Sequence, residues 1–100
     1  MFVAKIHGIE VCARCGEQKR LTKDHFVPKC CQMSVNMEGN YVGLCVDCNR
    51  EKANKVVLPS WYVYLNDNQK KTLCRYMRYA RSWIRTHCTD EEVLQFVESL

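Results

Sequence analysis

The most regular pattern of hydrophobic residues lies in the second half of the chain. Leu73, Met77, Ala80 and Ile84 follow the i, i+4, i+7, i+11 spacing of one helix face, which predicts an amphipathic helix over residues 67–87. Its polar face carries a run of basic residues with no acidic residue between them: Lys70, Lys71, Arg75, Arg78, Arg81 and Arg85. Like charges at helical spacing repel one another, so an anionic partner or solvent must offset them.

Three segments have strand-like composition. Residues 2–11 predict a strand that runs into the first cysteine, and residues 18–27 predict a second strand that Pro28 ends, since proline cannot donate a ladder hydrogen bond. Residues 41–44 predict a third strand. The polar stretch over 29–40 would join the second and third strands as the long loop of a hairpin.

Two shorter helices are also expected. Residues 45–55 have helix-forming composition, and Pro59-Ser60 is a helix-start signal. The run Thr89-Asp90-Glu91-Glu92 has the pattern of a capping box before a last helix over 90–99. Strands followed by helices predict an α+β fold.

Length and composition limit this fold to one small domain. The chain has 100 residues, and its 47% hydrophobic content includes eight cysteines, so the apolar core is thin and a covalent or metal staple is expected. No apolar stretch approaches the roughly 20 residues of a membrane span. The first residues, MFVAKIHGIEV, lack the basic and long apolar regions of a signal peptide. We therefore expect a cytoplasmic protein with no membrane partner, in a reducing compartment where paired cysteines usually bind metal.

Charge is distributed unevenly along the chain. Residues 14–85 hold fourteen Lys and Arg against six Asp and Glu, a net charge of +8. Residues 86–100 hold four acidic residues and no Lys or Arg, which gives −4. A basic body is typical of a polyanion partner, most often nucleic acid, although a solvated basic surface is the alternative.

Two cysteine pairs predict a metal site. Cys12-x-x-Cys15 and Cys45-x-x-Cys48 offer four thiolates in the pattern of a structural zinc site. A redox CxxC is the alternative, but that motif opens a helix in a βαβ context, which this chain lacks. The other cysteines do not pair convincingly, and we interpret them as ordinary small residues: Cys30, Cys31, Cys74 and Cys88.

The segment between and beside the two cysteine pairs, which we call knuckles, carries the most specific motifs. Asp24-His25-x-x-Pro28 follows the first cysteine pair, four residues separate Asn40 from Cys45 of the second pair, and Cys48 is followed by Asn49-x-x-Lys52. This order resembles the HNH endonuclease family over residues 12–55. The resemblance implies a zinc-stapled ββα-metal (His-Me finger) core over 12–55, with residues 59–100 as a helical extension of the same domain.

The resemblance also implies a function and a role for each motif residue. The protein would hydrolyse DNA phosphodiester bonds, by nicking or double-strand cleavage, and leave 5′-phosphate and 3′-hydroxyl ends. His25 would be the general base, and Asp24 and Asn49 would hold a catalytic Mg²⁺ or other divalent ion, for which a carboxylate and an amide oxygen are suitable ligands. Asn40 would hold the hairpin loop through backbone hydrogen bonds and so orient His25.

DNA contacts are expected on two helices. Arg50, Lys52 and Lys55 would lie along the helix that covers the hairpin, and the six basic residues of 67–87 would clamp DNA beside the site. Aromatic side chains could stack on bases, but we expect core packing against the long helix, whose apolar stripe Tyr76 and Trp83 flank. The residues concerned are Trp61, Tyr62, Tyr64, Tyr76, Tyr79 and Trp83.

Two departures from the family pattern and several alternatives remain. Asn49 stands where many members have histidine, and residues 29–39 contain one glycine where the family often has Gly-Gly. The alternatives are a junction-resolving nuclease, a ribonuclease, or a non-catalytic zinc ribbon that binds nucleic acid. A homodimer formed through the stripe Leu73–Ile84 is a further alternative. By analogy with small proteins of this family, the setting would be a phage, a mobile element or a bacterial cell.

Overall fold

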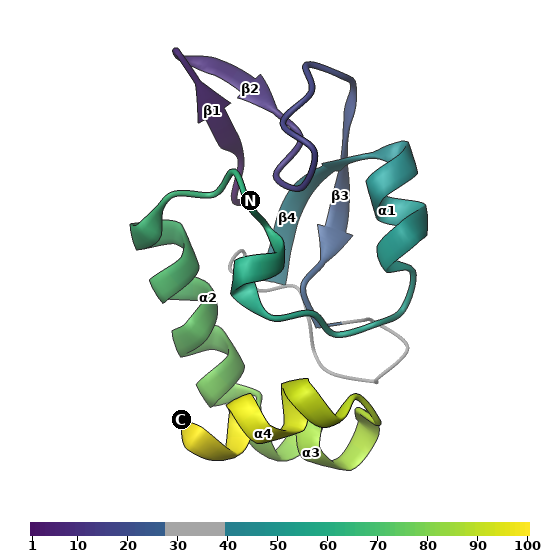
Figure 1. The fold of residues 1–100 in the computed structure, drawn as a ribbon, viewed down its shortest axis with the longest axis vertical. Coiled ribbons are helices and arrows are strands. Elements are labelled where there is room, and N and C mark those ends of the chain that lie inside the picture. Colours follow the sequence, from purple (N-terminus) through teal and green to yellow (C-terminus); the bar gives the residue numbers. More distant parts are fainter. Residues whose placement is uncertain (28–39) are drawn as a thin grey trace.

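The computed structural model describes residues 1–27 and 40–100 (Figure 1). Two small antiparallel sheets lie in the N-terminal half, and helices make up the rest. The structure is therefore α+β, as the pattern of strands and helices predicts. Pro28 and the loop expected up to Gly39, which includes Cys30 and Cys31, lie outside the described residues.

The first predicted strand is a hairpin in the structure. β1 (Ala4–Ile6) pairs with β2 (Ile9–Val11), with Ala4 opposite Val11. The expectation of one strand over 2–11 was wrong because His7 and Gly8, with φ values of 51° and 78°, form a two-residue turn. Two successive positive φ values match the twist of a tight hairpin, and glycine adopts the second one without strain.

The second hairpin is the one that carries the family motif. β3 (Leu21–His25) pairs with β4 (Tyr41–Cys45), so that Leu21 lies opposite Cys45 and His25 opposite Tyr41. The strand predicted over 18–27 is thus shorter at both ends. β4 gains a partner on its other edge, where Phe2 N donates to Tyr41 O and Phe2 O accepts from Gly43 N.

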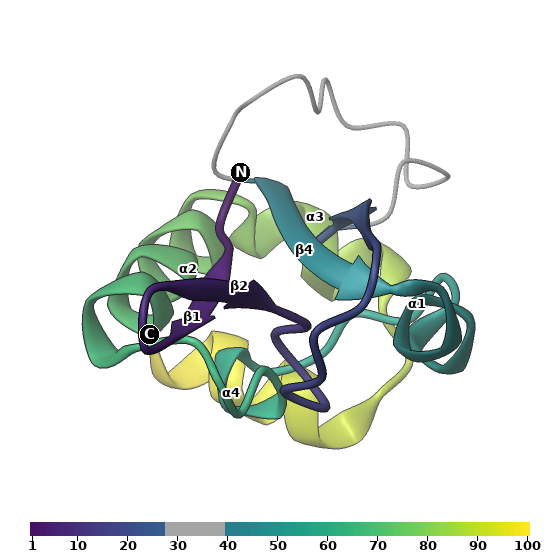
Figure 2. The same cartoon turned by 90° about the horizontal axis from the view of Figure 1, so that it is seen from above.

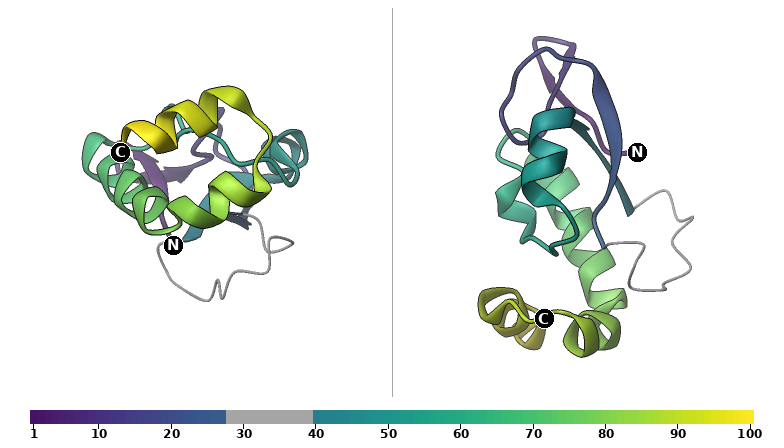
Figure 3. Two further views of the ribbon diagram at one scale, coloured as in Figure 1. Left: turned by 90° about the horizontal axis from the view of Figure 1, so that it is seen from below. Right: turned by 90° about the vertical axis from the view of Figure 1, so that its right-hand side faces the viewer.

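Helix α1 (Val46–Lys52) follows β4 without a loop and packs against the hairpin on one side (Figures 1 and 3). It ends earlier than the predicted limit of residue 55, because Ala53 adopts φ 49° and its amide donates to Asn49 O. The order strand, strand, helix is therefore present between residues 21 and 52.

The helix predicted over 67–87 is two helices. α2 (Asp67–Tyr79) ends at Ala80 (φ −87°, ψ 10°), and α3 (Arg81–His87) begins immediately after it. The bend brings α3 beside α4 (Glu91–Ser99), and the two lie together across the end of the molecule, as seen in Figure 3. The apolar stripe still continues through the bend, which is why its periodicity resembles that of one helix.

Helix starts are set by side-chain caps. Asn66 and Gln69 form a reciprocal capping box at α2 that the sequence pattern did not single out. At α4 the cap is Asp90, whose carboxylate accepts from the amides of Glu92 and Val93, so the cap is one residue later than the Thr89 box predicts. The helix-start signal at Pro59 produces a short 3-10 turn, η3 (Pro59–Trp61).

One cluster of buried side chains extends from Ala4 to Val97 and joins both hairpins to the helices. Figure 2 shows α2 and α1 on opposite sides of the hairpins. Leu73, Met77, Ala80 and Ile84 are all buried in it. The stripe is therefore part of the core of a single chain, and the alternative of a dimer through it was wrong. Among the described residues, no helix is long and apolar enough to span a membrane.

Candidate metal centre and active site

The four knuckle cysteines come together at one end of the β3–β4 hairpin. The Sγ atoms of Cys12, Cys15, Cys45 and Cys48 all lie within 4.8 Å of one another, and those of Cys15 and Cys45 are 3.9 Å apart. Zn–S bonds of about 2.3 Å in a tetrahedron place sulfur atoms about 3.8 Å apart. The cluster is therefore positioned to bind a metal ion and is consistent with structural zinc.

Backbone hydrogen bonds shape the first knuckle. Gly16 N donates to Cys12 O at 2.9 Å, and Cys12 N donates to Glu17 O at 3.0 Å. Gly16 has φ 74°, as expected for the glycine of a knuckle turn. The second pair needs no separate turn, since Cys45 ends β4 and Cys48 lies in the first turn of α1.

The segment around η3 braces the first knuckle. Tyr64 N donates to Ala13 O at 2.9 Å, and the Tyr64 ring lies over Gly16, where a Cβ atom would come within 2.5 Å of Tyr64 Cζ. The Arg14 guanidinium lies 4.8 Å from the centroid of the Trp61 ring and donates to Trp61 O. These contacts fasten the helical part of the chain to the metal site.

Burial, backbone hydrogen bonds and neighbouring thiols shift the pKa values of three of the four cysteines. Burial raises the pKa of Cys12, but backbone hydrogen bonds from Cys15, Cys45 and Arg14 outweigh it and lower that pKa to about 7. Burial and the neighbouring thiols raise the pKa of Cys48, and burial raises that of Cys15. A divalent cation would offset the repulsion between four thiolates at this spacing.

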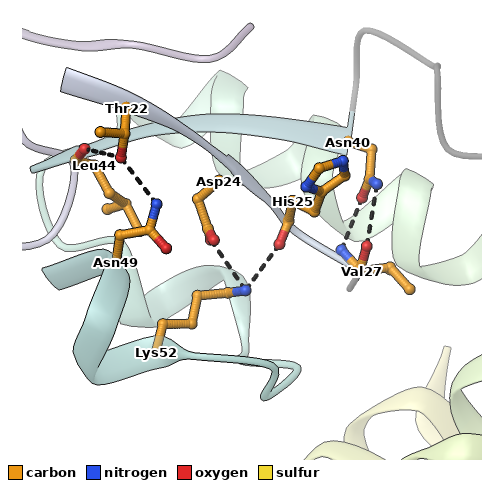
Figure 4. Close-up of polar contacts among 8 residues, drawn as sticks. All are labelled: Thr22, Asp24, His25, Val27, Asn40, Leu44, Asn49 and Lys52. Carbon is orange, nitrogen blue, oxygen red and sulfur yellow. Dashed lines mark hydrogen bonds and ion pairs between the residues drawn. The ribbon is translucent and has the colours of Figure 1, made fainter. Parts of the chain in front are cut away.

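Asp24 and Lys52 form a buried ion pair between β3 and α1. Lys52 Nζ lies 3.0 Å from Asp24 Oδ2, and the exposed fractions of the two side chains are 0% and 8%. The same ammonium donates to His25 O at 2.8 Å (Figure 4). Burial raises the pKa of Asp24, while the charge and hydrogen bond of Lys52 lower it in part.

Asn49 reaches the same strand from one turn earlier in α1. Thr22 Oγ1 donates its only proton to Leu44 O at 2.8 Å, so it can only accept from Asn49 Nδ2, which lies 2.9 Å away (Figure 4). This fixes the orientation of the amide. Asn49 Oδ1 is therefore the atom of this side chain that remains to bind a ligand.

His25 lies on the opposite face of β3 from Asp24. Its half-buried ring packs against Tyr41, with the ring centroids 4.9 Å apart. Neighbouring residues of a strand point to opposite faces, and α1 covers the face that carries Asp24. The backbone of His25, rather than its ring, is what Lys52 connects to Asp24.

Asn40 fastens the start of β4 to the chain after β3. Its fully buried side chain accepts from Val27 N at 2.7 Å and donates to Val27 O at 3.1 Å. Asn40 O also accepts from Phe26 N at 2.7 Å. Through its side-chain amide and its backbone carbonyl, Asn40 thus holds the two residues that follow His25, and the orienting role that the resemblance gives it stays a prediction.

The basic residues expected to contact DNA differ in exposure. Lys52 is buried, so the prediction that it contacts DNA phosphates was wrong: it lies three residues after Asn49, on the helix face that packs against β3. Residues at i and i+3 share a helix face, so the sequence alone could have placed Lys52 on the same face as Asn49. The other candidates are exposed or half-buried: Arg50, Lys55, Lys70, Lys71, Arg75, Arg78, Arg81 and Arg85.

The aromatic residues also differ in exposure. Tyr62 and Tyr76 are buried around Phe26, and Trp61 and Trp83 are half-buried. Core packing was the wrong expectation for two residues, since Tyr64 is 42% and Tyr79 is 78% exposed.

Comparisons of the chain with protein-family models, with curated proteins and with solved structures found no match. The functional argument therefore depends on the site itself.

Proposed function

We propose that the protein is a zinc-stapled, metal-dependent DNA endonuclease of the HNH type, with a ββα-metal core. The observation that supports this best is the seam between β3 and α1, where Asn49 contacts Thr22 and Lys52 contacts both Asp24 and the backbone of His25. Motif residues from two separate parts of the sequence, 24–25 on β3 and 49–52 on α1, thus lie side by side. A ribbon that only held zinc would not need this combination.

The oxygen atoms of Asn49 and Asp24 suit a hard divalent ion, and the Lys52 ammonium would compete with that ion for Asp24. Asn49 Oδ1 is turned away from its hydrogen bond to Thr22, and Asp24 has a second carboxylate oxygen besides the one facing Lys52. Amide and carboxylate oxygens are ligands of Mg²⁺ and Mn²⁺, which keep several waters in such sites. Because the Lys52 ammonium lies beside Asp24, the ion would bind weakly and depend on the DNA phosphate for further ligands.

The bound ion would polarise the scissile phosphate and stabilise the leaving oxygen. His25, which is half-buried, would take the proton from the attacking water. Asn40 would hold the backbone that follows His25 through Val27. Lys52 would hold the Asp24 carboxylate and the His25 carbonyl against α1, so we assign it a positioning role.

The basic side chains of α1, α2 and α3 would hold the DNA backbone. Such phosphate contacts position the nucleic acid and carry little sequence information, so low intrinsic specificity is expected. Affinity should fall steeply with salt, since each neutralised phosphate releases counterions.

Relaxation of supercoiled plasmid tests the proposal. Zinc-loaded protein with added Mg²⁺, Mn²⁺ or Ni²⁺ should convert supercoiled DNA to open circles whose nicks a ligase reseals, as 5′-phosphate and 3′-hydroxyl ends require. Absence of nicking with all three ions would contradict it.

One observation favours a second candidate, a non-catalytic zinc ribbon that binds nucleic acid. The Asp24 carboxylate is buried and paired with Lys52, as in a structural ion pair. This candidate predicts DNA binding without cleavage, so the same plasmid assay separates the two.

A further inference from the structure

The outward face of α2 combines cations with a bare aromatic ring. Lys71, Arg75, Arg78 and Tyr79 are all exposed, and at 3.6 residues per turn they fall within an arc of about 100°. Tyr79 is 78% exposed, the largest value among the exposed large hydrophobic side chains of the described residues. The opposite face holds Leu73, Tyr76 and Met77 in the core, which fixes the direction in which Tyr79 projects.

The charges of this face have no ion-pair partner among the described residues. Within residues 1–27 and 40–100, none of Lys71, Arg75 and Arg78 forms an ion pair within 4.0 Å. The only acidic residue of α2 is Asp67, in its first turn. The face is therefore complementary to a polyanion, and the exposed ring adds a flat apolar surface beside the charges.

Helix α3, which begins directly after α2, carries a hollow of its own. Ser82, Arg85 and Thr86 line an open hollow with a volume of about 360 Å³. Thr86 Oγ1 already donates to Ser82 O, so Arg85 and Ser82 are the donors that face it. One cation and a hydroxyl in an open hollow suit a phosphate group.

The core-facing side of α2 packs against the residue that follows β3. Tyr76, one turn before Tyr79, packs against Phe26 with ring centroids 6.2 Å apart, and Phe26 directly follows His25.

We propose that the outer face of α2 binds single-stranded DNA, with Tyr79 stacked on an unpaired base and Lys71, Arg75 and Arg78 on the backbone. In an intact duplex the bases already stack on one another, so a tyrosine ring adds most for a strand with unpaired bases. The inference rests on the proposed function and deepens it, because it makes nicked, branched or single-stranded regions the preferred substrate class.

Fluorescence anisotropy with labelled DNA tests the inference without cleavage. The His25→Ala protein, zinc-loaded and free of added Mg²⁺, is titrated with a 20-nucleotide single strand, the matching blunt duplex and a single-stranded RNA of the same sequence. Adding Tyr79→Ala should weaken binding of the DNA single strand about five-fold or more and change duplex binding less than two-fold. Tyr79→Phe, which keeps the ring, should bind as the parent does.

Three results would overturn the inference. These are unchanged single-strand affinity in Tyr79→Ala, an equal loss for single strand and duplex, and Tyr79-dependent binding of RNA but not of DNA. Zinc content and thermal unfolding of each variant show that it is folded. Because binding is measured in a protein that lacks His25, failure of the nuclease proposal leaves this result unaffected, and a nuclease with a silent Tyr79 fails only this inference.

Discussion

Lys52 places its ammonium 3.0 Å from the carboxylate of Asp24 in the interior of the protein, where both side chains are almost fully shielded from water. The pair joins α1 to β3, and the second bond of the ammonium, to His25 O, extends the connection by one residue. Lys52, which the motif suggests as a surface cation, is therefore a buried residue that connects α1 to β3.

Removal of Lys52 should destabilise the protein strongly. Lys52→Met leaves Asp24 buried without its cation, which costs about 3–5 kcal/mol in comparable pairs. The free energy of unfolding, measured by urea titration, should fall by this amount. The loss should shrink as the pH falls toward about 4, because burial raises the pKa of Asp24 and its neutral form needs no cation.

Two further variants give this prediction its controls. Lys55→Met changes an exposed lysine just beyond α1 and should alter stability by less than about 0.5 kcal/mol. Adding Asp24→Asn to Lys52→Met should recover part of the loss, since the buried charge is gone. If Lys52→Met were as mild as Lys55→Met, the ion pair would not hold the seam.

The cysteine cluster predicts one tightly held zinc per chain. Cys48→Ser should lower zinc content and the unfolding temperature together, because folding and metal binding are coupled in such sites. Cys74→Ser, at a half-buried cysteine of α2 outside the cluster, should keep the zinc. Metal analysis after gel filtration checks both, and a folded protein free of zinc would contradict the assignment.

Substitutions at two glycines distinguish the cost of backbone strain from the cost of a steric clash. Gly8 and Gly16 have similar φ values, 78° and 74°, but a Cβ at Gly8 has nothing within 4 Å, whereas one at Gly16 meets the Tyr64 ring. Gly8→Ala should therefore cost only about 1–2 kcal/mol for the positive φ. Gly16→Ala should cost clearly more and also lower zinc affinity. Equal losses in urea titrations would show that Tyr64 does not brace the knuckle.

Tyr62 should make the protein sensitive to alkali. Burial, and to a smaller degree the charge of Asp24, raise the pKa of Tyr62 well above its usual value. Above about pH 10 the unfolded chain loses this proton while the folded chain keeps it, so stability falls by up to about 1.4 kcal/mol per pH unit. Tyr62→Phe should reduce this slope. Its hydroxyl has no hydrogen-bond partner among the described residues, so the variant should be no less stable at pH 7. An unchanged alkaline slope would contradict this.

The sequence predicted much of the fold because local signals agreed with tertiary packing. The stripe from Leu73 to Ile84 is buried as its spacing requires, and the two CxxC pairs meet in space. The bend at Ala80 left no such signal, since the stripe continues through it, and α3 packs against α4 only after the bend has turned the chain. The turn at His7-Gly8 was missed although Gly8 was a visible cue.

For the candidate site, the sequence predicted which motif residues lie near the hairpin but not which way two side chains of the helices point. Asp24, His25, Asn40 and Asn49 are arranged around one hairpin and its covering helix, but their catalytic roles stay predictions. The interior position of Lys52 and the outward position of Tyr79 depend on which helix face meets the core. A charged residue can occupy such a face only when a buried partner is present, and Asp24 is that partner.

The most direct measurement is the rate of plasmid nicking by the wild-type protein and by His25→Ala at equal zinc content and equal DNA binding. General-base catalysis contributes about 10²–10⁴ in rate, so the variant should be at least about a hundred-fold slower with Mg²⁺ or Mn²⁺. His7→Asn, an exposed histidine in the β1–β2 turn whose positive φ asparagine tolerates, should match the wild type. Equal nicking by wild type and His25→Ala, or none by either, would contradict the nuclease account.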